Sequence, residues 1–210
     1  MRELILKMSL SMDGFVGNLD GGAKWVFGND PKAIAWTVDT VWDASLHIMG
    51  SRTFRDMAAY WPTSTEVFAP PMNQIPKAVF TRKGVGALKS ADTTAALRDA
   101  RANAGTALGT IKQKGAESWA EAYVAGGDLA TEVARLKSED GKPIVAHGGA
   151  SFARSLIAHG LVDQYALLVH PIALGRGLPI FTELAAPRSF KLIRSIPFPG
   201  GSVAQVYRPA

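Results

Sequence analysis

Cysteine is missing from this sequence: none of the 210 residues is a cysteine. Disulfide bridges and thiolate metal sites are therefore excluded. The absence says little about compartment, although it fits a protein of the cytoplasm. The four histidines are scattered along the chain, and such a distribution predicts no metal site.

Long hydrophobic runs are also missing. No stretch approaches the roughly 20 apolar residues that a membrane-spanning helix requires. The N-terminus leads from Met1-Arg2-Glu3 directly into Leu4-Ile5-Leu6, which is too short for a signal peptide and lacks a small-residue cleavage site. These absences predict a cytoplasmic protein without a membrane partner.

Charge of one sign is in modest excess but is nowhere concentrated. The formal net charge is +5, and the basic residues form only short groups such as Arg82-Lys83. No interleaved pattern of aromatic and basic residues resembles an RNA-binding motif. We therefore expect no nucleic-acid partner, whereas a cofactor that carries several phosphates would account for the positive charge.

The features that are present describe an α/β fold. Strand-length apolar runs alternate with segments of helical periodicity, which predicts a mostly parallel sheet with helices on both faces. Two last runs, separated by Pro-Phe-Pro-Gly-Gly, predict a C-terminal antiparallel hairpin. The expected strands are 3–11, 46–49, 77–81, 143–146, 165–169, 190–196 and 203–207, and the expected helices are 31–44, 53–59, 94–104, 127–138 and 152–160.

The length is that of one domain, and we expect residues 1–210 to form it. Residues 84–118 are polar, rich in Ala, Gly and Thr, and poor in large apolar side chains. This composition predicts an insertion on the main domain.

Two strand ends carry glycine directly before a helix: Gly50, and the pair Gly148-Gly149. Free N–H groups and the dipole at a helix N-terminus favour a phosphate, and glycine lets the phosphate approach the backbone. Two such turns in one sheet could hold both ends of a dinucleotide. Taken alone, Gly-Gly between a strand and a helix is more often just a tight turn, and Gly-Ser-Arg-Thr could simply be a helix start with an N-cap. Neither the Gly-x-Gly-x-x-Gly motif nor a Walker phosphate loop is present.

Four ordered motifs resemble those of the dihydrofolate-reductase-like superfamily, and most closely the riboflavin-biosynthesis reductases of the RibD C-terminal domain type. Gly-Ser-Arg-Thr at 50–53 resembles their Gly-Arg-x-Thr element, and the segment 9–16 is similar to their Ser-Leu-Asp-Gly segment. The turn at 145–152 looks like their second phosphate-binding turn. Residues 161–177 match the "Leu-Val-Asp-Glu … His-Pro … Leu-Gly-x-Gly" tail. The segment 84–118 does not match and is therefore expected to be atypical of the family.

The resemblance implies a dihydrofolate-reductase-like three-layer sandwich with about eight strands that binds NADPH. Its adenosine phosphates, 2′-phosphate and pyrophosphate would each contact one group of residues. A solvated loop is the alternative interpretation of the cationic pair in the second group. The residues that would contact the adenosine phosphates are Gly50, Ser51, Arg52 and Thr53. Those for the 2′-phosphate are Thr81, Arg82 and Lys83, and those for the pyrophosphate are Gly148, Gly149, Ala150, Ser151 and Phe152.

Two carboxylates are candidates for catalysis. Asp30 follows Trp25 and stands where dihydrofolate reductases have an acidic residue near the start of the first helix. It could donate a proton to substrate, or it could merely cap the helix that begins at Pro31. Asp13 lies in the loop expected to border the nicotinamide, where it could contact substrate or close an Asx-turn ahead of Gly14.

Val169 argues against dihydrofolate as the substrate, because the resemblance aligns it with a threonine that supports the acidic residue in folate reductases. The histidines at 47, 147 and 170 are interpreted as structural.

The sequence therefore predicts an NADPH-dependent reductase that passes a hydride from C4 of the nicotinamide to a small heterocyclic or carbonyl substrate, pterin-like or pyrimidine-like. The alternative is a non-catalytic NADP(H)-binding or sensing domain on the same fold. Beyond the small-molecule substrate, we expect a second copy of the chain as partner, in a homodimer.

Overall fold

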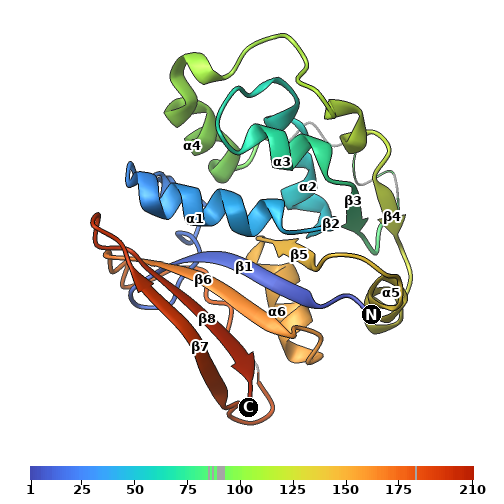
Figure 1. Ribbon diagram of the computed structural model, residues 1–210, viewed down its shortest axis with the longest axis vertical. Coiled ribbons are helices and arrows are strands. Elements are labelled where there is room, and N and C mark those ends of the chain that lie inside the picture. The colour runs from blue at the N-terminus through green and yellow to red at the C-terminus, as the bar shows by residue number, and fades with distance from the viewer. Residues whose placement is uncertain (85, 87, 89–92, 183) are drawn as a thin grey trace.

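The computed structural model describes residues 1–84, 86, 88, 93–182 and 184–210. In this part of the chain the strands form an eight-stranded sheet of order β4-β3-β2-β5-β1-β6-β8-β7 (Figure 1). The strands are β1 (Leu4–Ser11), β2 (Leu46–Gly50), β3 (Lys77–Phe80), β4 (Tyr123–Ala125), β5 (Ile144–His147), β6 (Gln164–His170), β7 (Phe190–Pro197) and β8 (Val203–Pro209).

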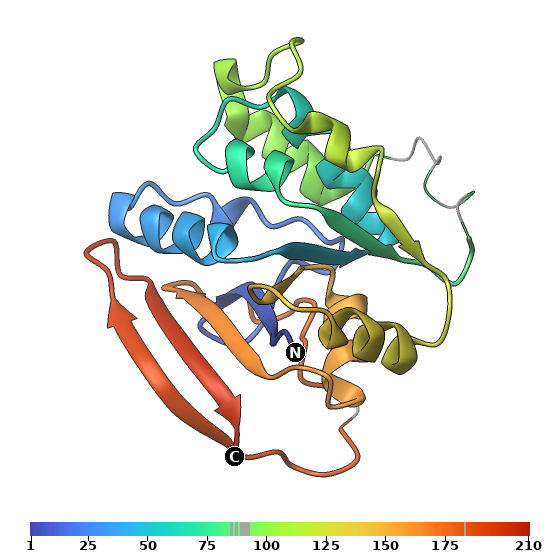
Figure 2. The same cartoon turned by 45° about the vertical axis from the view of Figure 1, so that its right-hand side comes forward.

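Six neighbouring strands, β1 to β6, run parallel to one another. The hairpin β7–β8 is antiparallel and joins the sheet through β6, as the sequence predicts. Figure 2 shows it as the outer flank of the sheet, on the side away from β4. We call the edge where the parallel strands end the carboxyl edge, and the opposite edge the amino edge.

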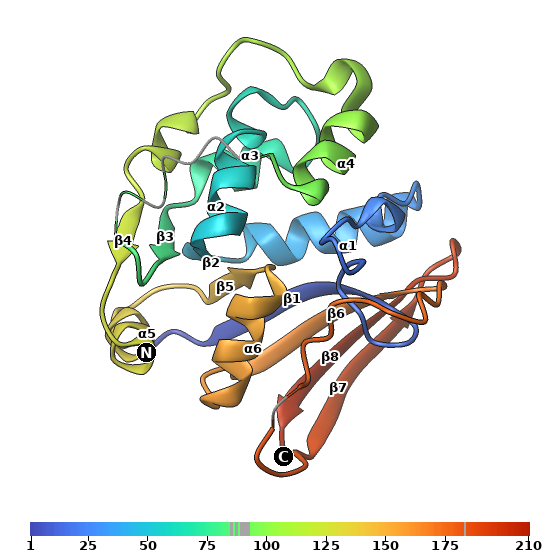
Figure 3. The same cartoon turned by 180° about the vertical axis from the view of Figure 1, so that it is seen from behind.

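Helices cover both faces of the sheet, which confirms the predicted sandwich. Core side chains of α5 and α6 pack under one face, and side chains of α1, α2 and α3 pack under the other. Figure 3, seen from behind, shows α6 in front of β5 and β1. The helices are α1 (Pro31–Trp42), α2 (Ser51–Ala58), α3 (Ala69–Gln74), α4 (Ala95–Ala104), α5 (Leu129–Ser138) and α6 (Ala150–Ala158).

The alternation of side chains along β1 connects the sequence to these two layers. Leu4 and Leu6 are fully buried in the core beneath α5 and α6, whereas Ile5 packs on the opposite face with Trp36 of α1. Because successive side chains of a strand point to opposite faces, Lys7 and Ser9 face the α1 side as well. A central strand that is otherwise apolar thus presents polar groups to one layer only.

Among the α-helices and strands of the described residues, the sequence does not predict α3 and β4. Pro70 and Pro71 would interrupt the interior of a helix, yet both lie in the first turn of α3. In that turn the missing N–H groups have no partner inside the helix anyway. Strand β4 has three residues, and its first side chain, Tyr123, is exposed. A segment this short carries too little alternation to be recognised.

The predicted insertion at 84–118 contains α4 in its described part, while residues 85, 87 and 89–92 lie outside the described residues. Leu97 of α4 packs against Tyr60. The carboxylate of Asp99 accepts the backbone N–H of Ala23 at 2.9 Å. The segment therefore supports the loop between β1 and α1. Its being atypical of the family stays a prediction.

No helix in the described part of the chain is both long and apolar enough to cross a membrane. Strand β7 is the outermost strand of the hairpin and exposes Leu192 and Ile193. The homodimer stays a prediction.

Candidate functional site

The two predicted phosphate-binding turns lie side by side at the carboxyl edge, because β2 and β5 are neighbours in the sheet. The hydroxyl of Thr53 donates to the carbonyl of Gly148 at 3.3 Å. A Cβ atom built on Gly50 would lie 3.2 Å from the Cβ of Phe152. The N-termini of α2 and α6 are therefore in direct contact, so one elongated anion could span both.

These two helices begin without a side-chain cap. Asp30, Thr94 and Asp128 each accept a backbone N–H at the start of α1, α4 and α5, respectively. Gly50 and Gly149 stand directly before the first residues of α2 and α6, and no side chain accepts a hydrogen bond there. The first N–H groups of a helix have no partner within it. At α2 and α6 they stay available to a ligand, and the helix dipole favours an anionic one.

Gly149 occupies a position that tolerates little else. Its φ angle is +85°, in the region that side-chain-bearing residues rarely adopt. A Cβ at this position would lie 2.6 Å from the hydroxyl oxygen of Thr53. Around the two turns, Ala150 is buried, Ser51 and Phe152 are half-buried, and Arg52 and Ser151 are exposed.

The third predicted group follows β3, the next strand along the sheet. The hydroxyl of Thr81 accepts the backbone N–H of Lys83 at 3.1 Å, which closes a local turn. Thr81 is buried, and Arg82 and Lys83 are exposed. All three predicted cofactor groups thus follow the ends of adjacent strands β3, β2 and β5.

Asp13 is fully engaged with the backbone. Its carboxylate accepts the hydroxyl of Ser11 at 2.6 Å and the N–H groups of Leu174 and Gly175, at 3.0 and 2.7 Å. The Ser11 hydroxyl and these amides hold the pKa of Asp13 below its ordinary value. Asp13 therefore joins the loop after β1 to the loop after β6. The predicted Asx-turn is not formed, because the N–H of Phe15 donates to the Ser11 hydroxyl and not to Asp13. The contact of Asp13 with substrate stays a prediction.

Asp30 is engaged in a similar way. It accepts the N–H groups of Lys32 at 2.9 Å and Ala33 at 3.2 Å, and also that of Gly200 in the β7–β8 turn. The Gly200 amide, together with the helix amides, keeps the pKa of Asp30 below its usual range. An ionised carboxylate that accepts three backbone amides is poorly suited to donate a proton. The geometry thus favours the capping alternative.

Lys7 is a candidate that sequence reasoning missed. In the sheet it stands between His147 of β5 and Ala166 of β6. Burial lowers the pKa of Lys7 to about 8. Within the described part of the chain, its ammonium has no hydrogen-bond or ion-pair partner. The available signal was a cation in the middle of an apolar central strand, because such residues are rarely buried without a purpose.

His170 also faces the α1 side, and this corrects the argument made from Val169. Val169 lies beside Leu10, whose side chain packs into the core under α5 and α6, so Val169 points away from α1. His170 instead meets the indole of Trp25 edge-on, with ring centroids 5.5 Å apart. Burial lowers the pKa of His170 to about 4, and the positive charge of Lys7 contributes. A neutral imidazole therefore stands at the end of β6.

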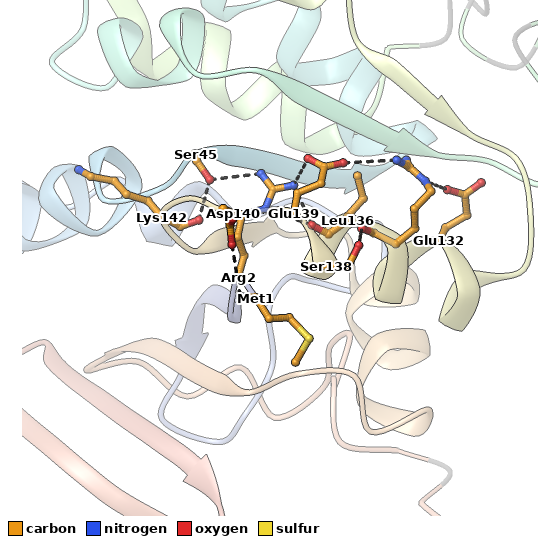
Figure 4. Close-up of polar contacts among 10 residues, drawn as sticks. Met1, Arg2, Ser45, Glu132, Leu136, Ser138, Glu139, Asp140 and Lys142 are labelled. Carbon is orange, nitrogen blue, oxygen red and sulfur yellow. Dashed lines mark hydrogen bonds and ion pairs between the residues drawn. The ribbon is translucent and has the colours of Figure 1, made fainter.

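A pocket of about 570 Å³ lies at the amino edge, opposite the predicted turns. Its two buried cations are satisfied by the protein itself, as Figure 4 shows for Arg2, which pairs with Glu139 at 2.6 Å. The ammonium of Lys77 donates to the carbonyls of Asn73 and Ile75, at 3.1 and 2.6 Å. Their contacts hold α5 and α3 to the sheet, so we assign this region a structural role.

Comparison with known families decides where the chain belongs. The family model of the RibD C-terminal domain matches residues 2–203. The chain belongs to the RibD C-terminal domain family. Among curated relatives, the uncharacterized protein YyaP of Bacillus subtilis is 38% identical over 80 residues, which cover 38% of this chain and 43% of YyaP. The chain thus aligns with less than half of that relative.

Solved structures confirm the dihydrofolate-reductase-like fold. A deaminase/5-amino-6-(5-phosphoribosylamino)uracil reductase of Thermotoga maritima superimposes with a TM-score of 0.65 at 18% identity, over 100% of this chain and 57% of that one. Dihydrofolate reductase of Enterococcus faecalis, solved with NADP(H), gives a TM-score of 0.57 at 12% identity, over 99% and 96% of the chains. At such low identities, these likenesses concern the fold.

Proposed function

We propose that this protein is an NADPH-dependent reductase of a small heterocyclic or carbonyl compound, with a pyrimidine-like or pterin-like ring as its substrate. The observation that carries the proposal is the contact between the uncapped N-termini of α2 and α6 at the carboxyl edge. Membership of the RibD C-terminal domain family and the fold shared with two reductases support an oxidoreductase.

The residues at this edge fit a phosphorylated dinucleotide. In the proposal, Gly50 to Thr53 and Gly148 to Phe152 hold the phosphates through backbone amides, and the guanidinium of Arg52 binds phosphate oxygens. Arg82 and Lys83 bind the 2′-phosphate and so select NADPH over NADH. When bound, the cofactor supplies a hydride to the substrate.

Reduction of a C=N or C=O bond requires a proton in addition to the hydride. The proposal assigns the proton to the ammonium of Lys7, which transfers it to the substrate nitrogen or oxygen as the hydride reaches the adjacent carbon. A pKa of about 8 keeps this lysine protonated at neutral pH and still able to release the proton. The neutral amine then takes up a proton from solvent before the next turnover.

A non-catalytic NADP(H)-binding or sensing domain is the second candidate. One observation favours it, because the acid at the start of α1 is occupied by the three backbone amides of Lys32, Ala33 and Gly200. Such a protein would bind NADPH through the same turns but would turn over no substrate. Lys7 is the group that distinguishes the candidates, because a sensing domain has no use for a proton donor.

Binding and turnover test the proposal separately. NADPH is expected to quench tryptophan fluorescence and to raise the unfolding temperature more than NADH does. The double variant Arg82→Ser/Lys83→Ser is expected to lose that preference, whereas Lys142→Ser at the amino edge keeps it. Absence of NADPH binding would refute both candidates. Oxidation of NADPH is then screened with pterins, flavin precursors, quinones and simple carbonyls, and binding without any turnover favours the sensing domain.

A further inference from the structure

A row of four basic side chains crosses the α1 face of the sheet. Lys77 of β3 stands beside His47 of β2, and His147 of β5 stands beside Lys7 of β1. The two histidines join these pairs, because their rings meet edge to face with centroids 4.5 Å apart. The row links the end of α1 to the candidate proton donor, and the mechanism above leaves both histidines without a role.

Both histidines have an unused nitrogen inside the protein. His47 is 0% exposed and His147 is 6% exposed. In the described part of the chain, Nδ1 of His47 and Nε2 of His147 are buried and have no hydrogen-bond partner. A buried polar atom without a partner costs free energy, so an unpaired nitrogen on each of two touching rings calls for an explanation.

The tautomer of His47 follows from its single partner. Its Nε2 lies 3.2 Å from the carbonyl of Val41 in the last turn of α1. A carbonyl can only accept, so Nε2 carries the hydrogen. Burial lowers the pKa of His47 to about 3, and burial also holds the pKa of His147 well below its ordinary value. Both rings are therefore neutral, each has one N–H, and Nδ1 of His47 is an acceptor.

We propose that His147 and His47 form a directional hydrogen-bond pair that positions Lys7. The structure has the two rings in contact but without a hydrogen bond between them. In the proposed pair the rings turn so that Nε2–H of His147 donates to Nδ1 of His47, which gives both unpaired nitrogens a partner. Nδ1 of His147 is then left without a hydrogen, and in the proposed arrangement it accepts from the ammonium of the neighbouring Lys7, which has no other partner in the described part of the chain. With the observed contact between His47 and Val41, the proposed bonds join Val41, His47, His147 and Lys7 in one chain of donors and acceptors. The histidines are positioning residues, because they act on the substrate only through Lys7.

The pair gives the lysine an uncharged acceptor. A carboxylate in place of His147 would stabilise the ammonium and raise its pKa, and so hinder release of the proton. The fourth member of the row, Lys77, is held by the carbonyls described above. His170 of β6 also faces the row; it packs on Trp25, and its Nε2 is buried without a hydrogen-bond partner in the described part of the chain. The functional meaning of the pair rests on the proposed reductase function, whereas its geometry does not.

Nuclear magnetic resonance of the intact protein labelled with ¹⁵N-histidine tests the geometry directly. Two-bond ¹H–¹⁵N correlations identify which ring nitrogen carries hydrogen. We expect the Nε2–H tautomer for both His47 and His147 at neutral pH. An Nδ1–H tautomer or a doubly protonated ring at His147 would overturn the proposal, because either would leave no lone pair for Lys7.

Variants of His147 test the effect on Lys7. In His147→Phe the acceptor is lost, and the pKa of Lys7, followed by the ¹³Cε shift of labelled lysine, is expected to fall by about one unit. His147→Asn places an amide oxygen near the former Nδ1, so the pKa of Lys7 is expected to return most of the way to its wild-type value. His159→Phe is the matched control, because this histidine is exposed at the end of α6.

Kinetics provide the second readout. With any substrate from the reductase screen, the alkaline limb of the kcat profile should move down with the pKa of Lys7 in His147→Phe, while KM for NADPH stays unchanged. An unchanged Lys7 pKa in folded His147→Phe would refute the pair. If no substrate is reduced, the reductase proposal fails, and the NMR titration still decides the geometry. If His147→Phe does not fold, the tautomers of the wild-type protein decide.

Discussion

Substitution of Gly149 by alanine tests the turn on which the proposed function rests. The residue has a φ angle of +85°, and holding a side-chain-bearing residue in such a region costs on the order of 1–3 kcal/mol. The new Cβ would lie 2.6 Å from the hydroxyl of Thr53, which must rotate away. Rotation breaks the hydrogen bond to Gly148, worth about 1 kcal/mol.

The two costs together give a loss of about 2–4 kcal/mol in the free energy of unfolding. For a protein of this length, the unfolding temperature should fall by roughly 4–16 °C. The assay is thermal unfolding followed by circular dichroism, with and without NADPH. Because the Cβ also points into the contact between α2 and α6, NADPH is expected to protect Gly149→Ala far less than the wild-type protein.

Two further variants separate the backbone cost from the clash. Gly14 has a φ angle of +87° and no atom within 4 Å of a built Cβ, so Gly14→Ala carries the backbone cost alone. Adding Thr53→Ala to Gly149→Ala removes the clash and leaves the backbone strain. If Gly149→Ala melted no lower than Gly14→Ala and bound NADPH like the wild-type protein, the tight turn and its role in phosphate binding would both be wrong.

Three other predictions concern charged side chains. Lys7→Met is expected to lower kcat by about 10²-fold or more and to leave NADPH binding unchanged. The activity of the wild-type protein should fall as pH rises through about 8, because the lysine loses the proton that it donates. Initial rates measured as a function of pH check both results. Because the pKa of Lys7 is lowered from 10.5 to about 8 on folding, the unfolded chain binds more protons than the folded one between these pH values. The free energy of unfolding of the wild-type protein should therefore rise with pH in this window. Denaturant titrations should show a flatter pH dependence for Lys7→Met. Asp30→Asn should keep turnover, whereas Asp30→Ala should melt earlier; loss of turnover in a folded Asp30→Asn would restore the proton-donor role. Arg2→Met should lower the free energy of unfolding, measured by denaturant titration, by about 2 kcal/mol without changing the Kd for NADPH. Lys142→Met removes an exposed ion pair and should lower the free energy of unfolding only slightly.

The order of strands and helices could be predicted because apolar residues alternate in the strands and recur at helical spacing. The two glycine turns were also recognisable, since each combines a strand, a glycine and a helix in a continuous stretch. Their contact with each other could not be read locally, because Thr53 and Gly148 are 95 positions apart.

The roles of the two carboxylates were hidden for the same reason. Gly200 lies 170 positions after Asp30, and Gly175 lies 162 positions after Asp13. The local sequence indicates a helix cap at Asp30 or a turn at Asp13. It does not show the distant backbone amides that donate to these two carboxylates. The error at Val169 has another origin: a shift of one residue along a strand exchanges its two faces. Only the pairing of β6 with β1 shows that His170 is the residue on the α1 side.

The course of the last strand has a practical consequence. Strand β8 runs against β6, so the chain returns to the amino edge at Ala210, the edge from which β1 also starts. Both ends marked in Figure 1 therefore lie on the opposite side of the sheet from the glycine turns of α2 and α6. An affinity tag, a surface tether or a fused protein attached at either end would leave the carboxyl edge open. Immobilised protein should therefore retain its full capacity for NADPH.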